Sequence, residues 1–388
     1  MAEFIQKDNT FVANTYARFP IQIVNGKGSL CYDVNGKEYV DMGSGIGVTA
    51  FGYCDTLWVN SVIDQLGKVQ HTSNLYYTEP CALLAEALCN RTGFKKVFFS
   101  NSGAEANECA IKTARKYACE KKGEEFYNII TLNNSFHGRT ITTLSATGQD
   151  HFHKLFQPLT TGFIHVNAND NQGLEVAVKN NKVAAIMIEC VQGEGGVLPL
   201  EKTFTDAISE ICQKEDILLI VDEVQTGNGR TGKLYSYMNY GLTPDLVTTA
   251  KGLGGGLPIG ACMFGEKTQN VLGFGDHGST FGGNPVACAG ALNIINRIDE
   301  KLLEEVNQKS KYVFNELSSC EGIKSVSGLG LMIGIETAKP VKEVMAYCIE
   351  NGVLPLTAKT KLRLLPALNI PMEQLKKAIE IIKKACND

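Results

Sequence analysis

Short apolar runs alternate with helical patterns between about residues 80 and 290, and this alternation is the strongest constraint on the fold. Runs of this length without charged residues are typical of strands that are buried on both faces. The alternation predicts an α/β fold in which helices cover a mostly parallel sheet. The clearest strand candidates are residues 97–99, 128–132, 184–188 and 217–221.

The two ends of the chain have a different pattern. With 388 residues, the chain is long enough for two domains, or for one large domain with an accessory one. The Asn35-Gly36 turn signal predicts a hairpin in the N-terminal segment. Longer amphipathic helices fill the last part of the chain, where we also expect strands at 328–336 and 361–365 and a final helix opened by Pro371.

Composition excludes several classes of function. A formal charge of −4 provides no basic field for nucleic acid and no polybasic patch for a membrane. Residues 1–10 contain no apolar signal core, and no run approaches the roughly 20 residues of a membrane span. We therefore expect a cytoplasmic protein. The 13 cysteines are scattered singly, which predicts reduced core residues and no metal site.

Two strand ends carry the first candidate catalytic residues. Asp222 follows the apolar run 217–221, and Lys251 follows a second strand-like run, 245–250. Ligands bind at the carboxyl ends of strands in open α/β sheets. Burial lowers the pKa of a lysine, which makes it a nucleophile for a Schiff base, and a nearby acid can hold a pyridine nitrogen. Taken singly, Lys251 also fits a solvated loop lysine and Asp222 a structural acid.

Residues 100–107 predict a helix that begins directly after a strand. Ser102 and Glu105 match the S-x-x-E capping box, and Gly103 and Ala104 leave the first N–H groups uncrowded. Such a helix N-terminus can bind a phosphate, although simple capping without a ligand explains the same pattern.

Four further residues have two interpretations each. Phe136 could cover a flat ring or belong to the core, and Arg139 could bind a carboxylate or be a surface charge. Glu194 lies in a glycine-rich turn. Arg363 lies in a strand pattern of period 2, so it could face inward, where it would need an anionic partner such as Glu194 or a substrate.

One further motif is typical of a different class of protein. Residues 227–233 (GNGRTGK) match the G-x-x-x-x-G-K pattern of nucleotide triphosphatases, but Leu234 stands where a serine or threonine would hold magnesium. We interpret the match as a coincidence. A scaffold protein without catalysis is the other alternative, and the joint presence of Lys251, Asp222, Arg139 and Arg363 argues against it.

Nearly the whole chain resembles class III aminotransferases of the pyridoxal-phosphate, fold-type I group (aspartate aminotransferase-like), and within them the acetylornithine branch. The resemblance implies a large α/β domain at 51–289 and a small α+β domain made of 1–50 and 290–388. Blocks in the family order carry it: 100–108 (SNSGAEANE), 136–140 (FHGRT), 192–196 (QGEGG), 221–227 (VDEVQTG), 249–252 (TAKG) and 277–285 (HGSTFGGNP). Residues 71–77 (HTSNLYY) resemble the acetylornithine branch in particular.

The resemblance implies pyridoxal 5'-phosphate as the cofactor and Lys251 and Asp222 as the catalytic residues. Lys251 would bind the cofactor and move the proton between the substrate carbon and C4′, while Asp222 would pair with the ring nitrogen. Gln225 would contact the ring hydroxyl, and Phe136 and Val224 would cover the two ring faces. The full implied cofactor set is Ser102, Gly103, Ala104, Phe136, His137, Asp222, Val224, Gln225, Lys251, Ser279 and Thr280.

The resemblance also implies how substrates and subunits meet. Ser102, Gly103 and Ala104 would hold the phosphate, with Thr280 supplied by the second subunit of a homodimer. Arg139 would bind the distal carboxylate of an ω-amino substrate. Arg363 would bind the α-carboxylate of glutamate and would pair with Glu194 when no α-carboxylate is present. The implied substrate-binding set is Arg139, Glu194, Arg363 and Tyr16.

The implied reaction moves the terminal amino group of N2-acetylornithine to 2-oxoglutarate, giving N-acetylglutamate 5-semialdehyde and glutamate, in arginine biosynthesis. Succinylornithine, ornithine and 4-aminobutyrate aminotransferases of the same class remain alternatives. The chain departs from the family pattern at 52–55 (GYCD) and at Glu189-Cys190. We expect both departures to lie near the substrate entrance without touching a chemical role.

Overall fold

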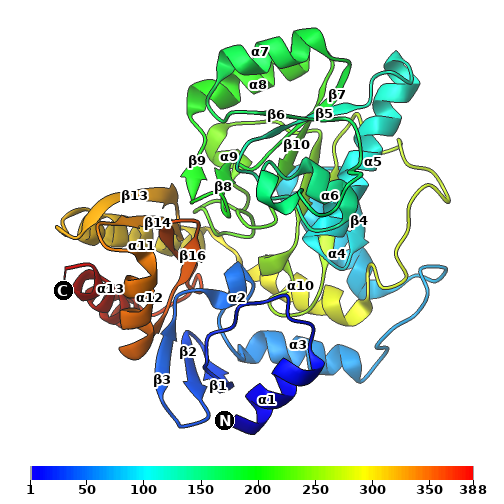
Figure 1. Cartoon of the computed structure of the whole chain (residues 1–388). Coiled ribbons are helices and arrows are strands. Elements are labelled where there is room, and N and C mark those ends of the chain that lie inside the picture. Colours follow the sequence, from blue (N-terminus) through cyan, green and yellow to red (C-terminus); the bar gives the residue numbers. More distant parts are fainter. Residues whose placement is uncertain (1, 388) are drawn as a thin grey trace.

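The computed structural model describes residues 2–387, and a seven-stranded sheet runs through the larger part of it (Figure 1). The strand order is β4-β12-β11-β10-β7-β5-β6. β12 is antiparallel to both neighbours, and every other pair is parallel, so the predicted mostly parallel sheet is present. The strands are β4 (Lys96–Ser100), β5 (Asn128–Leu132), β6 (Phe163–Val166), β7 (Val183–Ile188), β10 (Leu218–Asp222), β11 (Leu246–Thr249) and β12 (Gly260–Phe264).

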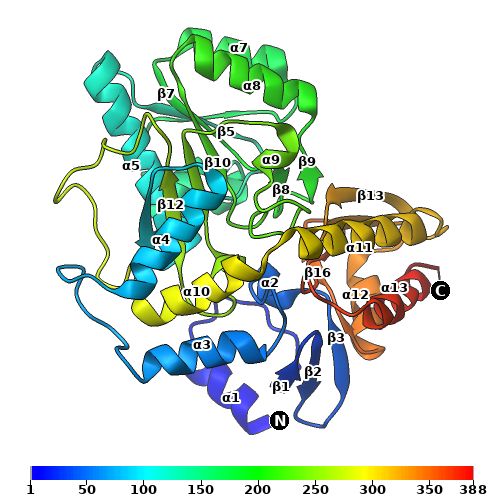
Figure 2. The same cartoon turned by 180° about the vertical axis from the view of Figure 1, so that it is seen from behind.

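Helices cover both faces of this sheet, which explains why its central strands are apolar throughout. Every residue of β7 is buried. Because side chains alternate along a strand, Ala185 and Met187 pack with α5 (Gly103–Lys122), whereas Ile186 and Ile188 pack with the helices on the other face. Those helices are α4 (Glu79–Thr92), α7 (Asn171–Asn180), α8 (Lys202–Lys214) and α10 (Pro285–Arg297) (Figure 2).

A second hydrophobic core lies beside the large sheet. It packs the sheet β13-β14-β17-β16 against three helices, and it also takes in Val40 and Met42 from the N-terminal part of the chain. The strands are β13 (Ile323–Leu329), β14 (Met332–Thr337), β16 (Leu356–Ala358) and β17 (Lys361–Leu364). The helices are α11 (Glu300–Ser318), α12 (Val341–Glu350) and α13 (Met372–Asn387).

One small sheet joins the two ends of the chain. Its order is β1-β2-β3-β15, and Val353 of β15 pairs in parallel with Val40 of β3. This pairing supports the division into 51–289 and 1–50 with 290–388, which stays a prediction and whose residues 1 and 388 lie outside the described chain. The strands are β1 (Ile23–Lys27), β2 (Leu30–Asp33), β3 (Glu38–Asp41) and β15 (Val353–Leu354).

Two parts of the fold differ from the sequence prediction. The strand expected at 328–336 is a hairpin, because Gly330 has a φ of +60° and reverses the chain between β13 and β14. The N-terminal segment also begins with a helix, α1 (Ala2–Phe11), which was not predicted. The remaining elements are α2 (Ser44–Gly47), α3 (Thr56–Leu66), α6 (Ile141–Ala146), β8 (Val191–Gln192), β9 (Leu198–Pro199) and α9 (Tyr237–Tyr240).

Among residues 2–387, no helix is both long enough and apolar enough to cross a bilayer.

Candidate active site

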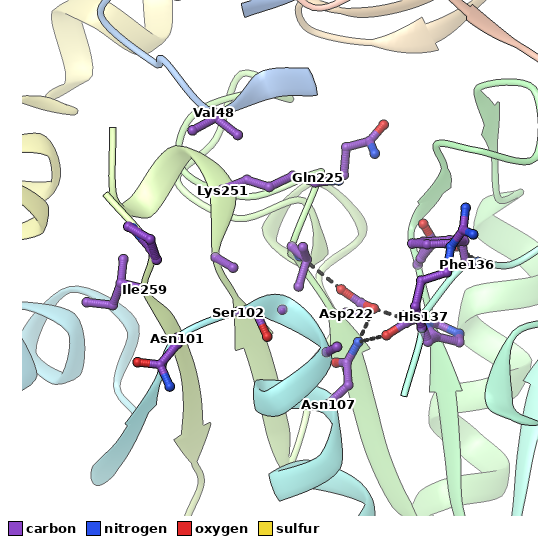
Figure 3. A pocket seen from close by; sticks show the side chains of 18 of the residues that line it. Val48, Asn101, Ser102, Asn107, Phe136, His137, Asp222, Gln225, Lys251 and Ile259 are labelled. Carbon is purple, nitrogen blue, oxygen red and sulfur yellow. Dashed lines mark hydrogen bonds and ion pairs between the residues drawn. The ribbon is translucent and has the colours of Figure 1, made fainter. Parts of the chain in front are cut away.

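The two predicted catalytic residues line one cavity. Asp222 ends β10, and Lys251 begins the short helix η2 (Lys251–Leu253) after the neighbouring strand β11. The two strands are parallel with Asp222 opposite Thr248, so their carboxyl ends open at the same edge of the sheet. Both residues line a cavity of about 440 Å³ at that edge (Figure 3).

Lys251 is held in an unusual backbone conformation. Its φ is +44°, in the left-handed region that non-glycine residues rarely adopt. Such strain persists where the surrounding structure fixes it, often at functional sites. Burial is the main cause that lowers the pKa of the Lys251 amine, although the nearby Glu194 charge acts in the opposite direction. The amine is therefore more nucleophilic than that of an exposed lysine.

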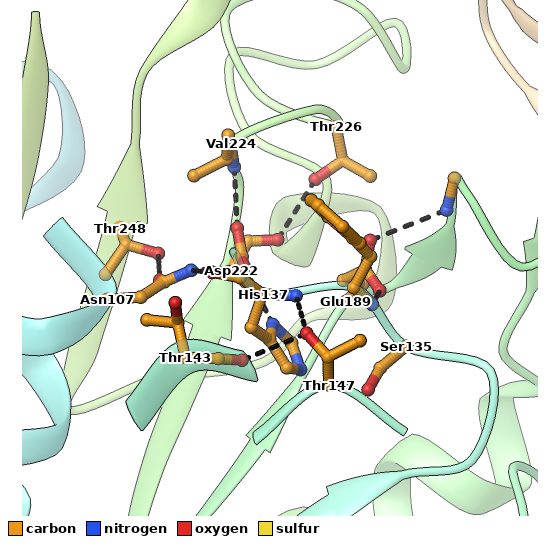
Figure 4. Close-up of polar contacts among 12 residues, drawn as sticks. Asn107, Ser135, His137, Thr143, Thr147, Glu189, Asp222, Val224, Thr226 and Thr248 are labelled. Carbon is orange, nitrogen blue, oxygen red and sulfur yellow. Dashed lines mark hydrogen bonds and ion pairs between the residues drawn. The ribbon is translucent and has the colours of Figure 1, made fainter. Parts of the chain in front are cut away.

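Three donors fix the carboxylate of Asp222, which is only 3% exposed. The backbone N–H of Val224 donates to Oδ1 at 2.9 Å, while Nδ1 of His137 and Nδ2 of Asn107 both donate to Oδ2 at 2.8 Å (Figure 4). Burial alone would lower the pKa of His137, but its bond to Asp222 outweighs burial and raises that pKa. The paired donors make a charged carboxylate tolerable at this buried position.

The N-terminus of α5 forms an anion-binding wall of the cavity. Ser102 is the N-cap and accepts from the Glu105 N–H at 3.2 Å. The Glu105 carboxylate accepts from the Asn101 N–H at 2.6 Å, so the predicted capping box closes one residue earlier than expected. Helix geometry leaves the first N–H groups, those of Gly103 and Ala104, without intrahelical acceptors.

A side chain could not replace Gly103 in this wall. A Cβ atom there would lie 2.6 Å from Cγ1 of Val224, which is far inside van der Waals contact. The close approach brings the free N–H groups of α5 beside Val224 and the strand end that carries Asp222. The residues present therefore fit a flat, phosphate-bearing ring: an anion cradle, an apolar side chain, a buried carboxylate and a nucleophilic amine in one cavity.

Phe136 forms another wall, and a residue assigned no role by the sequence holds it. The backbone N–H of Phe136 donates to the Glu189 carboxylate at 3.0 Å. Glu189 also lines the cavity, and burial raises its pKa to about 7. Glu189 therefore supports a wall of the cavity, while the expectation that Glu189-Cys190 touches no chemical role stays a prediction. Cys190 is fully buried and does not line the cavity.

An arginine–glutamate pair lies next to the cavity. Nη1 of Arg363 donates to Glu194 Oε1 at 2.6 Å and to Gln225 Oε1 at 3.0 Å, and Gln225 Nε2 donates to Glu194 at 3.2 Å. Arg363 is 3% exposed, so it faces inward as its strand pattern allowed. Burial would raise the pKa of Glu194, but the Arg363 charge outweighs it and the pKa is lowered. The Arg363 side chain is buried, whereas that of Glu194 is 29% exposed.

Arg139 lies at the cavity wall and is itself exposed. Its guanidinium stacks 4.4 Å from the ring centroid of Phe152 and 5.6 Å from that of Phe136. Stacking of this kind holds a guanidinium in place while leaving its N–H edge free for a carboxylate.

Five of the predicted site residues do not line this cavity: the Glu194–Arg363 pair beside it, and Tyr16, Ser279 and Thr280. Tyr16 is 71% exposed and stacks with Arg18, while Thr280 is exposed. Ser279 lies near the rim, where its hydroxyl accepts from Nδ2 of Asn101 at 3.0 Å. Their roles stay predictions. The cavity residues Asn101, Asn107 and Glu189 were not predicted from the sequence. For Asn107 a signal was available, because it lies four residues after Gly103 and therefore on the same face of the predicted helix.

Residues 227–233 do not form a nucleotide cradle. Arg230 is buried and donates to the backbone carbonyls of Leu331 and Pro366. No helix starts at Lys233 in the described chain, which has a turn there before the short α9. The segment makes hydrogen bonds within the fold and does not form a phosphate loop, so the nucleotide triphosphatase alternative is wrong.

The fold and this cavity together define a pyridoxal-phosphate-dependent transferase of fold type I. The family model for class III aminotransferases matches residues 11–386. The chain belongs to the class III aminotransferase family, which confirms the resemblance inferred from the sequence.

Two curated relatives show how far the similarity extends. The acetylornithine aminotransferase of Haemophilus ducreyi is 49% identical over 99% of this chain and 98% of its own length. The acetylornithine aminotransferase of Methanocaldococcus jannaschii is 43% identical over 96% of this chain and 95% of its own.

Solved structures agree with this placement. The ornithine aminotransferase of Toxoplasma gondii matches with a TM-score of 0.95 and 33% identity, covering 100% of this chain and 94% of that one. The N-acetylornithine aminotransferase of Stenotrophomonas maltophilia matches with a TM-score of 0.85 and 32% identity, covering 98% of both chains. The Toxoplasma enzyme has been observed with pyridoxal phosphate at its active site, and the cofactor of the family is pyridoxal phosphate.

Proposed function

We propose that the protein is an acetylornithine aminotransferase, which transfers the terminal amino group of N2-acetylornithine to 2-oxoglutarate. The observation that carries this proposal is similarity to acetylornithine aminotransferases at 41–49% identity over nearly the full chain. The cavity supports it with a nucleophilic lysine, a fixed aspartate and two arginines suited to carboxylates.

The residues of this chain would hold the cofactor as follows. Lys251 binds it covalently, Asp222 pairs with its ring nitrogen, and Gln225 contacts its ring hydroxyl. The N-terminus of α5 binds its phosphate, and Phe136 and Val224 enclose the ring. The bound cofactor supplies an electron sink for the substrate carbon. Lys251 would also move the proton between the substrate carbon and C4′.

The Arg363–Glu194 pair would let one cavity accept two kinds of substrate. N-acetylornithine reacts through its terminal amine and presents no α-carboxylate beside that amine, so the pair stays closed. Glutamate presents an α-carboxylate, which replaces Glu194 as the partner of Arg363. Either way no buried charge is left unpaired, which would cost several kcal/mol.

We expect the substitution Glu194→Ala to shift substrate preference toward α-amino donors. Without the competing carboxylate, Arg363 is free for glutamate, so the ratio of kcat/KM for glutamate to that for N-acetylornithine should rise about tenfold. The matched Glu194→Gln variant keeps the shape without the charge and should shift in the same direction. An unaltered ratio in both variants would dispose of the proposed exchange.

We expect Arg139→Ala to weaken use of the ω-amino donor. Loss of a charge-assisted contact of about 1.5–3 kcal/mol lowers kcat/KM for N-acetylornithine roughly tenfold to a hundredfold. Arg139→Lys keeps the charge but not the planar fork and should recover only part of the loss. If the alanine variant has unchanged kinetics, Arg139 does not bind the substrate.

The protein would act as a homodimer with shared active sites. Two loops support this proposal: residues 67–78, between α3 and α4, and residues 265–284, between β12 and α10. Both loops extend from one side of the molecule (Figures 1 and 2), and both expose large apolar side chains. Asn74 Nδ2 donates to the backbone carbonyls of Ser279 and Gly282 and so joins the two loops. Thr280 is then available to the phosphate site of a second copy. The exposed apolar residues are Leu75, Tyr76, Tyr77, Phe274 and Phe281.

A panel of amino donors tests the proposed activity. Purified protein is mixed with 2-oxoglutarate and with N-acetylornithine, N-succinylornithine, ornithine or 4-aminobutyrate, and glutamate formation is measured. N-acetylornithine should have the highest kcat/KM. A clear preference for ornithine or 4-aminobutyrate would contradict the proposal while leaving the family assignment intact. Cytoplasmic location stays a prediction.

A further inference from the structure

We propose that Asn107 is a positioning residue for the cofactor ring, and that Thr248 supports it by donating to its amide oxygen. The proposal deepens the proposed function, because it rests on Asp222 pairing with the ring nitrogen. It concerns a side chain on α5 that is 1% exposed and lines the cavity next to Asp222 (Figure 4).

Both N–H donors and the oxygen of the Asn107 amide are engaged in the active site. Its Nδ2 donates to Oδ2 of Asp222 at 2.8 Å and to the backbone carbonyl of His137 at 2.7 Å. Its Oδ1 accepts from the hydroxyl of Thr248 at 2.6 Å. An amide that makes all three bonds has one orientation, with its donor side toward Asp222.

Thr248 satisfies the oxygen end of the Asn107 amide. It is fully buried on β11, directly opposite Asp222 on β10, so both residues present their side chains to the same part of α5. The Asp222 carboxylate and the His137 carbonyl can only accept, so they prevent a flip that would turn the amide oxygen toward the carboxylate, and the Thr248 hydroxyl donates to the Oδ1 on the other side. That flip would place two acceptors together and leave buried polar groups unpaired.

Asn107 also connects three parts of the site whose relative positions must be fixed: the N-terminus of α5, the loop that carries Phe136 and the end of β10. It lies four residues after Gly103 on the helix whose N-terminus forms the phosphate cradle. Its bond to the His137 carbonyl fixes the loop that carries Phe136, and its bond to Asp222 fixes the end of β10. His137 can change its charge, whereas the Asn107 amide donates at any pH, so it is the constant donor to the carboxylate.

The inference is tested by comparing two ligands on apo-enzyme freed of cofactor by dialysis against a scavenging amine. One ligand is pyridoxal 5'-phosphate, and the other is its analogue with C–H in place of the ring nitrogen. The dissociation constant of the analogue divided by that of pyridoxal 5'-phosphate measures how well Asp222 recognises the ring nitrogen. In the unchanged protein the analogue should bind more weakly. If both bind equally well there, the pairing of Asp222 with the ring nitrogen is wrong, and the proposed function loses that element.

Asn107→Leu should lower this ratio about tenfold or more, because the carboxylate loses a charge-assisted partner. Thr248→Val should lower the ratio less than Asn107→Leu does. Thr248→Ser keeps the hydroxyl, so it should have the same ratio as the unchanged protein. The control is Thr113→Val, which removes another fully buried hydroxyl, one that bonds only to the Cys109 carbonyl of α5, and should leave the ratio unchanged.

Two outcomes overturn the assignment of Asn107. If Asn107→Leu weakens both ligands equally, its role is structural only. If the unchanged protein distinguishes the ligands and both Asn107→Leu and Thr248→Val keep the same ratio, neither residue positions Asp222. Thermal unfolding of each variant is recorded alongside, and Thr248→Val provides the decisive result if the leucine variant does not fold.

Discussion

Lys251→Ala abolishes turnover and removes the visible absorption band of the lysine-linked cofactor. The amine has two roles, covalent attachment and proton movement, and general acid–base catalysis alone is worth about a hundredfold to ten-thousandfold. The lowered pKa of the Lys251 amine and the left-handed backbone conformation at Lys251 distinguish this residue from an ordinary exposed lysine. We expect kcat to fall by at least about a thousandfold, measured as glutamate formation from N-acetylornithine and 2-oxoglutarate.

Two further variants separate nucleophilicity from charge. Lys251→Arg keeps a cation at the same position but has no usable nucleophile, so it should be as inactive as the alanine variant. Lys233→Ala changes an exposed lysine in the loop after β10 and should leave both the spectrum and the rate unchanged. Transamination by Lys251→Ala at a rate comparable to the unchanged enzyme would show that another residue is the nucleophile.

Asp222→Asn is expected to have the second largest effect. The substitution keeps the size of the side chain but removes the charge that would pair with the ring nitrogen. Removal of one preorganised charged partner lowers kcat by about a hundredfold to a thousandfold. Cofactor affinity should also fall, and both are measured by titrating the apo-enzyme with pyridoxal 5'-phosphate and assaying the product.

The same variant has a second consequence that does not require cofactor. Burial lowers the pKa of His137 and Asp222 raises it, so in Asp222→Asn burial is opposed only by the weaker effect of the Glu189 charge and the pKa should fall. NMR of the imidazole in apo-enzyme measures this directly. In the unchanged protein, protonated His137 stabilises the fold below about pH 6.5, and this contribution disappears as the pH rises through its raised pKa. A His137 pKa equal in both proteins would mean that the pair does not interact in solution.

The sequence predicted the strand ends correctly because their signals are local. The apolar runs before Asp222 and Lys251 are buried strands, and Ser102 caps the helix that follows β4. The prediction failed at 328–336, where the apolar run before Glu336 hides a reversal at Gly330. Periodicity cannot distinguish one long strand from two short ones when the turn itself contains no polar residue.

Residues that act on a neighbour rather than on a ligand were harder to predict. Asn107 matters because α5 packs across the ends of β10 and β11, and Glu189 matters because it reaches the backbone of Phe136. Neither contact follows from spacing along the chain. The hydrogen bonds that carry them span 115 and 53 residues.

The sequence by itself determined the family, the α/β alternation and the two strand-end residues, since each depends on a short segment whose chemistry can be recognised in isolation. Only the tertiary structure decided which distant side chains share a hydrogen bond. Arg363 and Glu194 are 169 residues apart, yet they form a partly buried ion pair beside the cavity. A buried charge has to find a partner, and the packing of the second core against the large sheet selects that partner.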